Sequence, residues 1–129
     1  MTFRPAVVAS SEDLTRYLLE RGKFSRENER VKYNAFMPTI TGNVSVFRTS
    51  ELSDAAIWRI GTEHVESVLK KAVLARAELK AHVVADHGLT IQPSEPPRRR
   101  ANISGWPSEQ TAVRLRAMRL AEESRLVVR

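Results

Sequence analysis

The sequence predicts an α+β fold, in which a small mixed or antiparallel sheet of about three to four short strands is packed by about three helices. Three observations predict this fold class. Segments with helical periodicity alternate along the chain with short runs of β-forming residues, and turn-forming residues separate the two kinds of segment. A chain of 129 residues is also long enough for one hydrophobic core. We therefore expect a single compact domain over residues 1–129.

The first helix is predicted over residues 10–22. Two serines can cap its start, acidic residues follow in its first turn, and Gly22 can end it. On a helix, Leu14, Tyr17 and Leu18 would share one face.

Two further helices are predicted from apolar residues at helical spacing. The longer one covers residues 50–77, where Gly61 can divide it and Thr62 can cap the second part. The last one covers residues 108–124. Its core-facing stripe consists of Val113, Ala117, Leu120 and Ala121.

Short β-forming runs predict the strands. One follows a turn at residues 41–43 and reads Asn-Val-Ser-Val-Phe-Arg. A hairpin is expected from residues 79–85 and 89–92, which the Asp86-His87-Gly88 turn would join. Residues 125–129 predict a last strand.

Composition bounds the chemistry of the protein. The sequence has no cysteine, which excludes disulfides, thiolate metal sites and cysteine nucleophiles. The only apolar run near the N-terminus is four residues long, too short for a secretory core or a membrane span. We expect a cytoplasmic protein with no membrane partner.

Positive charge is concentrated near the C-terminus. Residues 98–129 contain 8 arginines and 3 glutamates, a net charge of +5, whereas the whole chain carries +6. Arginine offers a planar fork of donors that matches phosphate or carboxylate. A genome rich in GC would also favour arginine over lysine, so the overall preference has two explanations.

The segment Pro-Ser-Glu-Pro-Pro-Arg-Arg-Arg-Ala-Asn-Ile-Ser-Gly-Trp-Pro, residues 93–107, carries the densest cluster of charge. Its prolines favour an extended, stiff backbone. The cluster of Arg98, Arg99 and Arg100 would then be held just ahead of the last helix, whose N-terminus itself favours anions. The alternative is a solvated loop, or one that pairs with the protein's own carboxylates.

The last helix can extend this basic surface. Arg116 and Arg119 share a helical face, and Trp106 could stack on a base of single-stranded nucleic acid. The alternatives are structural. Arg119 can pair with Glu123 on the same helix, and Trp106 can pin the start of the helix as a hydrophobic staple.

Three residues around the predicted hairpin are candidates for catalysis. His82 and His87 could move protons near neutral pH. On the predicted strand His82 and Asp86 would lie about 13 Å apart, too far for a direct pair. The alternative is a polar sheet face without catalytic function. His64 lies within an apolar helical stripe, where a hydrogen-bonded core residue is expected.

The segment from Asp86-His87 to Asn102 resembles the pattern of the ββα-metal nucleases, in which Asp-His at a strand end is followed by an asparagine and a helix. The resemblance covers under a third of the chain. It implies a metal-dependent nuclease, but the downstream helix has no histidine or asparagine to complete the metal site. The cysteine knuckles of many members are missing as well.

No nucleotide-binding glycine loop, zinc-protease motif or nucleophile elbow is present. We therefore expect a small binding module, without cofactor or metal, whose arginine-rich loop and last helix contact nucleic-acid phosphates or an acidic protein surface. Two alternatives remain open. One is a subunit or adaptor of a larger assembly that uses the same surface. The other is a small hydrolase or nuclease-like enzyme for a phosphorylated substrate. Homo- or hetero-oligomers are compatible with each.

Overall fold

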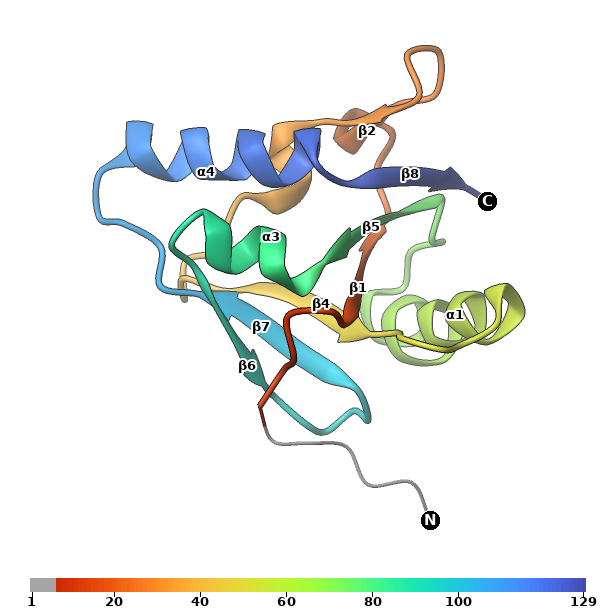
Figure 1. The fold of residues 1–129 in the computed structure, drawn as a ribbon. Coiled ribbons are helices and arrows are strands. Elements are labelled where there is room, and N and C mark those ends of the chain that lie inside the picture. Colours follow the sequence, from red (N-terminus) through yellow and green to blue (C-terminus); the bar gives the residue numbers. More distant parts are fainter. Residues whose placement is uncertain (1–6) are drawn as a thin grey trace.

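A six-stranded antiparallel sheet is the centre of the computed structural model, which describes residues 7–129 (Figure 1). The strands lie in the order β6-β7-β4-β1-β5-β8. Their bounds are β1 Asp13–Leu18, β4 Val44–Arg48, β5 Ala75–Lys80, β6 Thr90–Pro93, β7 Arg100–Ser104 and β8 Arg125–Val128. The α+β class is confirmed, and the sheet is antiparallel with more strands than expected.

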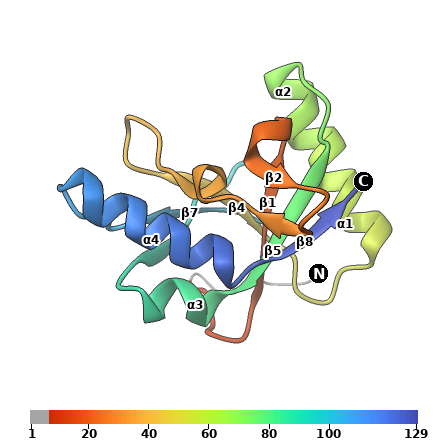
Figure 2. The same ribbon diagram turned by 90° about the horizontal axis from the view of Figure 1, so that it is seen from above.

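Helices cover both faces of the sheet. The helices α3, Ala81–Asp86, and α4, Gln110–Glu122, lie on one side, and α1, Asp54–Ile60, lies on the other (Figures 1 and 2). A π-helical turn, η3 at Gly61–Glu66, continues α1 into the short α2 at Ser67–Leu69. The smaller elements are the 3₁₀ turns η1, Arg21–Lys23, and η2, Tyr33–Phe36, and the two-stranded ribbon of β2, Phe24–Ser25, with β3, Arg30–Val31.

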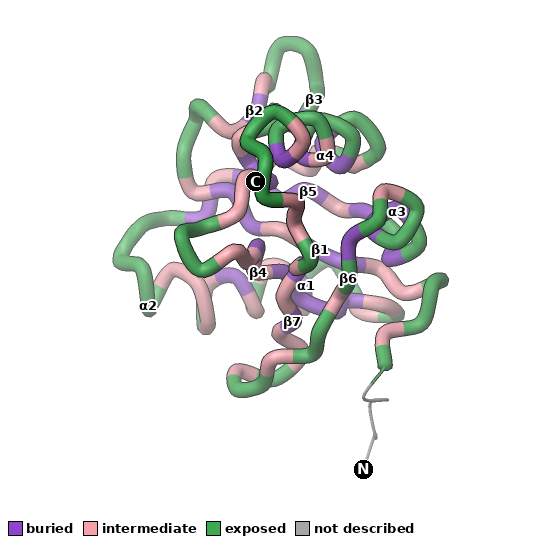
Figure 3. The backbone as a smooth tube through the Cα atoms, turned by 90° about the vertical axis from the view of Figure 1, so that its left-hand side faces the viewer, coloured by how far each residue is buried: buried purple, intermediate pink, exposed green. Residues whose placement is uncertain are grey.

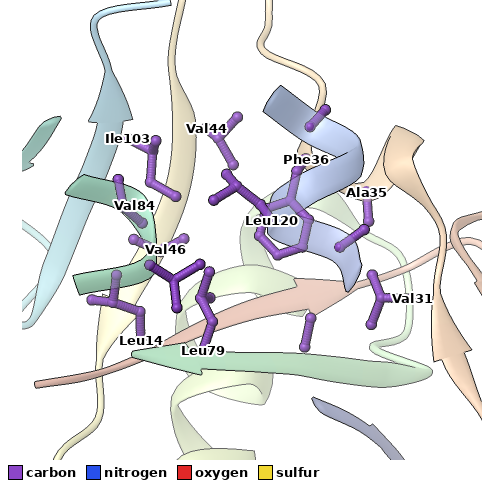
Figure 4. Packing of buried hydrophobic residues seen from close by; sticks show 14 of the residues in the cluster. Leu14, Val31, Ala35, Phe36, Val44, Val46, Leu79, Val84, Ile103 and Leu120 are labelled. Carbon is purple, nitrogen blue, oxygen red and sulfur yellow. The ribbon is translucent and has the colours of Figure 1, made fainter. Parts of the chain in front are cut away.

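The larger hydrophobic core lies between the sheet and the pair α3 and α4. Leu14, Val46 and Ile103 project from three neighbouring strands toward Leu120 of α4 and Phe36 of η2 (Figure 4). All five side chains are almost completely buried. The smaller core lies under α1 on the opposite face and contains Tyr17, Phe47, Ile57 and Val73.

The predicted helix over residues 10–22 is wrong, because this segment contains the central strand β1. Leu14 and Leu18 lie in the larger core, whereas Tyr17 lies in the smaller one. A strand that is covered on both faces needs apolar side chains on both. The spacing of its apolar residues therefore does not show the simple alternation by which strands are recognised.

The predicted helix over residues 50–77 is correct only as far as Leu69. Lys70 adopts the left-handed conformation (φ 59°), which ends the helix, and β5 begins at Ala75. Gly61 does not divide the helix, since the backbone continues through it in a π-helical turn. The N-cap is Ser53, whose side chain accepts a hydrogen bond from the Ala56 N–H.

The predicted hairpin of residues 79–92 is also wrong. The strand β5 ends at Lys80, and the chain then enters α3, which contains His82 and Asp86. His87 is the residue that caps the end of this helix. The N–H groups of Ala81 and His82 donate to the carbonyls of Glu12 and Ser10. The strand β6 does form, but it pairs with β7.

Three other predicted elements are confirmed as β4, α4 and β8. All four apolar residues predicted to face the core from α4 are buried. Over residues 7–129, no helix combines the length and the apolar composition that crossing a membrane requires.

A bidentate ion pair links the segment before β1 to β4. Arg48 Nε donates to Glu12 Oε1 and Arg48 Nη2 to Glu12 Oε2, both at 2.8 Å. The Arg48 side chain is only 4% exposed and that of Glu12 only 17%. The hydrogen bond from Arg48 holds the pKa of Glu12 below its usual range. Folding therefore favours the ionised carboxylate.

Substitution of Glu12→Gln is expected to lower the free energy of unfolding at pH 7 by about 2–4 kcal/mol, because the buried charge of Arg48 would lose this carboxylate. The pKa of Glu12 is lower in the folded protein, so its contribution is present above the unfolded pKa and is lost as the pH falls through the folded pKa. Urea unfolding should thus show wild type and variant converging between pH 7 and pH 3. The exposed Glu27→Gln is the control, and an equal difference at both pH values would contradict the assignment.

Substitution of Gly61→Ala is expected to destabilise the protein by about 1–3 kcal/mol, because a Cβ there would lie 2.8 Å from Tyr17 Cε1. The Tyr17 ring cannot easily move, since it is buried in the smaller core and its hydroxyl donates to the Ile57 carbonyl. Gly22→Ala is the matched control, as its Cβ would meet nothing within 4 Å. Thermal unfolding of both variants tests the contact, and equal melting temperatures would refute it.

Candidate anion-binding groove

The arginine loop is the tip of the β6–β7 hairpin. The Ser94 N–H donates to the Arg100 carbonyl at 2.8 Å, and the Arg100 N–H donates to the Pro97 carbonyl at 3.2 Å. The peptide bonds before Pro96 and Pro97 are cis. The predicted extended arm is therefore wrong, because the loop turns back on itself. The strand β7 also separates the loop from α4, so the arginines do not lie at the start of that helix.

The three arginines of the loop differ in their surroundings. Arg98 is exposed at the hairpin tip. Arg99 has a positive φ of 74°, its backbone N–H donates to the Glu95 carboxylate, and its Nη1 donates to the Arg48 carbonyl. Arg100 begins β7, and its Nε donates to Ser45 Oγ at 3.1 Å. Arg100 lines a hollow of the surface.

That hollow, which we call the anion groove, has a volume of about 430 Å³. It lies between the sheet and the η3–α2 segment, and Pro97 and Arg100 of the hairpin line one side. Arg16 and His64 are its other nitrogen-bearing side chains, and none of the described residues that line it is acidic. The apolar lining includes Leu19, Phe47, Val65, Val68 and Leu69.

Arg16 lies where the two central strands separate. Only two residue pairs join β1 to β4, whereas six join β1 to β5. Beyond the last β1–β4 pair, Arg16 Nη1 donates to the Ser45 carbonyl at 2.9 Å, and its Nε donates to the Ala35 carbonyl at 3.0 Å. The guanidinium thus replaces part of the missing ladder.

Burial alone lowers the pKa of Arg16 to about 10. The guanidinium remains charged at neutral pH, yet it has lost part of its hydration. A desolvated charge that hydrogen-bonds only to neutral carbonyls is unfavourable compared with one that faces an anion. Arg16 therefore supplies an attractive electrostatic environment for an anionic group in the groove.

The opposite part of the groove is apolar. The His64 ring stacks on Phe47 with centroids 6.4 Å apart and planes at 19°. Val68 and Leu69 are 70% and 58% exposed, large values for aliphatic side chains. Ligand sites commonly combine such an apolar lining with a few polar groups in a cavity of a few hundred Å³. The groove fits an anion that carries a flat or apolar moiety.

The other residues predicted to bind anions lie on or beside α4, on the opposite side of the sheet. Trp106 packs against the larger core, and its Nε1 donates to the Ile103 carbonyl at 3.1 Å. Arg116 Nη1 donates to the His87 carbonyl at 2.8 Å. Arg119 pairs with Glu122 rather than Glu123. These side chains and the hairpin arginines do not form a continuous basic stripe.

The structure brings His82 and Asp86 together. Because both lie on α3, four residues apart, His82 Nδ1 is 3.2 Å from Asp86 Oδ2, and the predicted separation is wrong. His87 Nε2 pairs with the carboxylate of Glu123. These groups lie next to the start of β6, whereas the arginine loop follows its end, about 10 Å farther along the strand. Among the described residues, His82 and His87 thus do not line the hollow that Arg100 lines.

The pattern of the ββα-metal nucleases does not form. Asp86 lies at the end of helix α3 instead of a strand, and Asn102 lies within β7. The described part of the chain contains no group of three or more His, Asp or Glu side chains placed to hold a metal ion.

Sequence reasoning missed Arg16 and the apolar part of the groove. Arg16 was assigned to an amphipathic helix, in which a charged residue is ordinary. The signal that could have identified it is a single arginine within the run Leu-Thr-Arg-Tyr-Leu-Leu, once that run is recognised as a central strand. Comparison with family models, with curated proteins and with solved structures found no match to this chain.

Phenyl phosphate is expected to stabilise the protein more than inorganic phosphate does, because its ring can cover the apolar part of the groove. At a ligand concentration ten times its dissociation constant, the free energy of unfolding should rise by about 1.4 kcal/mol, which corresponds to a shift of several degrees in melting temperature. Arg100→Ala should reduce the shift in melting temperature for both ligands. Val68→Ser should reduce only the additional shift that phenyl phosphate gives over inorganic phosphate. Arg114→Ala, on α4, is the control for loss of charge. Equal shifts for the two ligands would contradict a two-part groove.

Proposed function

We propose that the protein is a non-enzymatic binding module that holds single-stranded nucleic acid in the anion groove. A phosphate lies against Arg16 and Arg100, and its nucleoside covers the apolar lining. The observation that supports this most strongly is the presence of two guanidinium groups at a partly apolar groove that contains no described acidic residue. Planar guanidinium groups match phosphate oxygens in geometry and charge.

The form of the groove favours a single strand over a duplex. Unpaired bases can leave the stack and lie on aromatic and apolar side chains, whereas bases in a duplex are held inside the helix. A hollow of about 430 Å³ admits a group of nucleotide size and not a double helix. The exposed Arg98 at the hairpin tip adds a phosphate contact outside the groove.

A role in a protein assembly is the second candidate, and the exposed Val68 and Leu69 at the groove favour it. An acidic segment with an apolar residue would satisfy the same groove. The enzymatic alternative has no comparable support, because His82 and His87 are not among the described residues that line the groove.

The test is a fluorescence-anisotropy titration with labelled single-stranded RNA, single-stranded DNA and duplex DNA at several salt concentrations. We expect both single strands to bind more tightly than the duplex. Each arginine that neutralises a phosphate should contribute about 0.7 to the slope of log K against log salt. Arg100→Ala should therefore weaken binding about tenfold and reduce the slope by about 0.7.

Arg114→Ala is the matched control, because it removes one arginine from α4 and leaves the groove intact. It should change the affinity less than twofold. If Arg114→Ala and Arg100→Ala weakened binding equally, the binding would be a response to total charge and the groove would not be the site. If no nucleic acid bound, the proposed function would be wrong, and an acidic protein segment would become the expected occupant.

A further inference from the structure

A polar surface on β6, β7 and β4 lies beside the anion groove. Ala101 and Ile103 of β7 point into the larger core, so strand alternation places Arg100 and Asn102 on the opposite face. The register pairs Asn102 with Gln92 of β6 on one side and with Ser45 of β4 on the other. Directly paired residues project from the same face of a sheet. Gln92 and Asn102 therefore present two adjacent amides next to Arg100.

On this face of the sheet, α1 covers the centre but does not extend over the β6 edge. The helix α1 packs on the smaller core of Tyr17 and Phe47, in β1 and β4. At the β6 edge, Gln92 is exposed and Asn102 is half-buried. Figure 3 shows that the residues of β6 and of the hairpin tip beyond it are exposed or intermediate.

Hydrogen bonding distinguishes the Asn102 amide from its neighbours. Thr90 and Ser104 bond to each other at 2.9 Å, and Ser45 Oγ accepts from Arg100. In contrast, the Oδ1 atom of Asn102 has no hydrogen-bond partner among the described residues. A buried acceptor without a donor is unfavourable. The terminal torsion of asparagine is soft, so a ligand that offers a donor can draw the amide toward it.

We infer that Gln92 and Asn102 recognise a base of the bound strand and select adenine. This inference rests on the proposed function, which places a phosphate of the strand at Arg100. Arg100 and Asn102 are two residues apart on one strand, about 7 Å between their Cα atoms. A base attached to the phosphate at Arg100 can thus reach the amides within one nucleotide.

Adenine matches an amide better than the other bases do. An amide side chain offers one donor and one acceptor side by side. Adenine presents the complementary pair at N6–H and N7, whereas guanine presents only acceptors at O6 and N7. On the Watson–Crick edge every base offers a donor next to an acceptor, so the selection of adenine rests on its N6–H and N7 edge. The N6–H donor is essential to that arrangement.

The experiment measures the affinities of four RNA oligomers of equal length, with adenine, guanine, cytosine or uracil at every position. A fifth oligomer carries purine, which lacks the 6-amino group, in place of adenine. We expect about tenfold tighter binding of the adenine oligomer than of the cytosine and uracil oligomers, and loss of that preference with purine. Gln92→Ala and Asn102→Ala should each reduce the preference. Gln110→Ala, an exposed amide on α4, should preserve it.

The outcomes separate the two proposals. Binding of all five oligomers with equal affinity would overturn base selection by the amides and leave the phosphate groove standing. Base selection by the amides would also be overturned if two results were obtained together. The purine oligomer would bind as tightly as the adenine oligomer, and Gln92→Ala would keep the full preference for adenine, so neither the N6 donor nor the exposed amide would matter. Absence of binding to every oligomer would overturn the proposed function itself. The purine oligomer keeps the test decisive even if Asn102→Ala fails to fold.

Discussion

The limited pairing between β1 and β4 is the constraint on which the rest of the structure depends. The strand β1 supplies side chains to both cores and pairs fully with β5, but it meets β4 over only two residue pairs. A sheet that opens in its centre leaves backbone carbonyls without donors, and Arg16 satisfies the one at Ser45. Arg16, which bridges this opening, also lines the anion groove. The opening in the sheet and one charge of the groove therefore involve the same side chain.

Arg16 has two effects that oppose each other. Its hydrogen bonds close the gap between the strands, while its burial lowers the pKa of the guanidinium and so disfavours the charged form. Elsewhere the protein avoids this conflict, because buried Arg48 and Arg76 are paired with carboxylates. A desolvated arginine without such a partner is unfavourable for stability and favourable for binding an anion. This contrast between arginines of one protein is the reason for assigning a function to the groove.

The sequence allowed prediction of the elements whose signals are local. The helix α4 has an apolar stripe on one face, and β4 and β8 are short runs of β-forming residues, so all three were predicted near their observed bounds. The strand β1 was misassigned because a strand that is buried on both faces has no alternation of apolar and polar residues. The helix α3 was misassigned because it is too short for its apolar residues to show a helical period. The candidate site shows the same difference. Arg100 is predicted from its local cluster in the sequence, whereas the position of Arg16 at the groove depends on how two distant strands meet.

Local charge density in the sequence does not show which arginines remain available to an anion after folding. The last quarter of the chain holds most of the excess arginine, yet folding engages many of those side chains internally. Arg119 and Arg125 pair with glutamates, as does Arg129, and Arg116 donates to a carbonyl. The potential felt by a ligand depends on the charges that remain after such pairing and on how far each is desolvated. By that measure Arg16, which is partly buried and donates to neutral carbonyls, is a stronger candidate for binding an anion than the exposed arginines near the C-terminus.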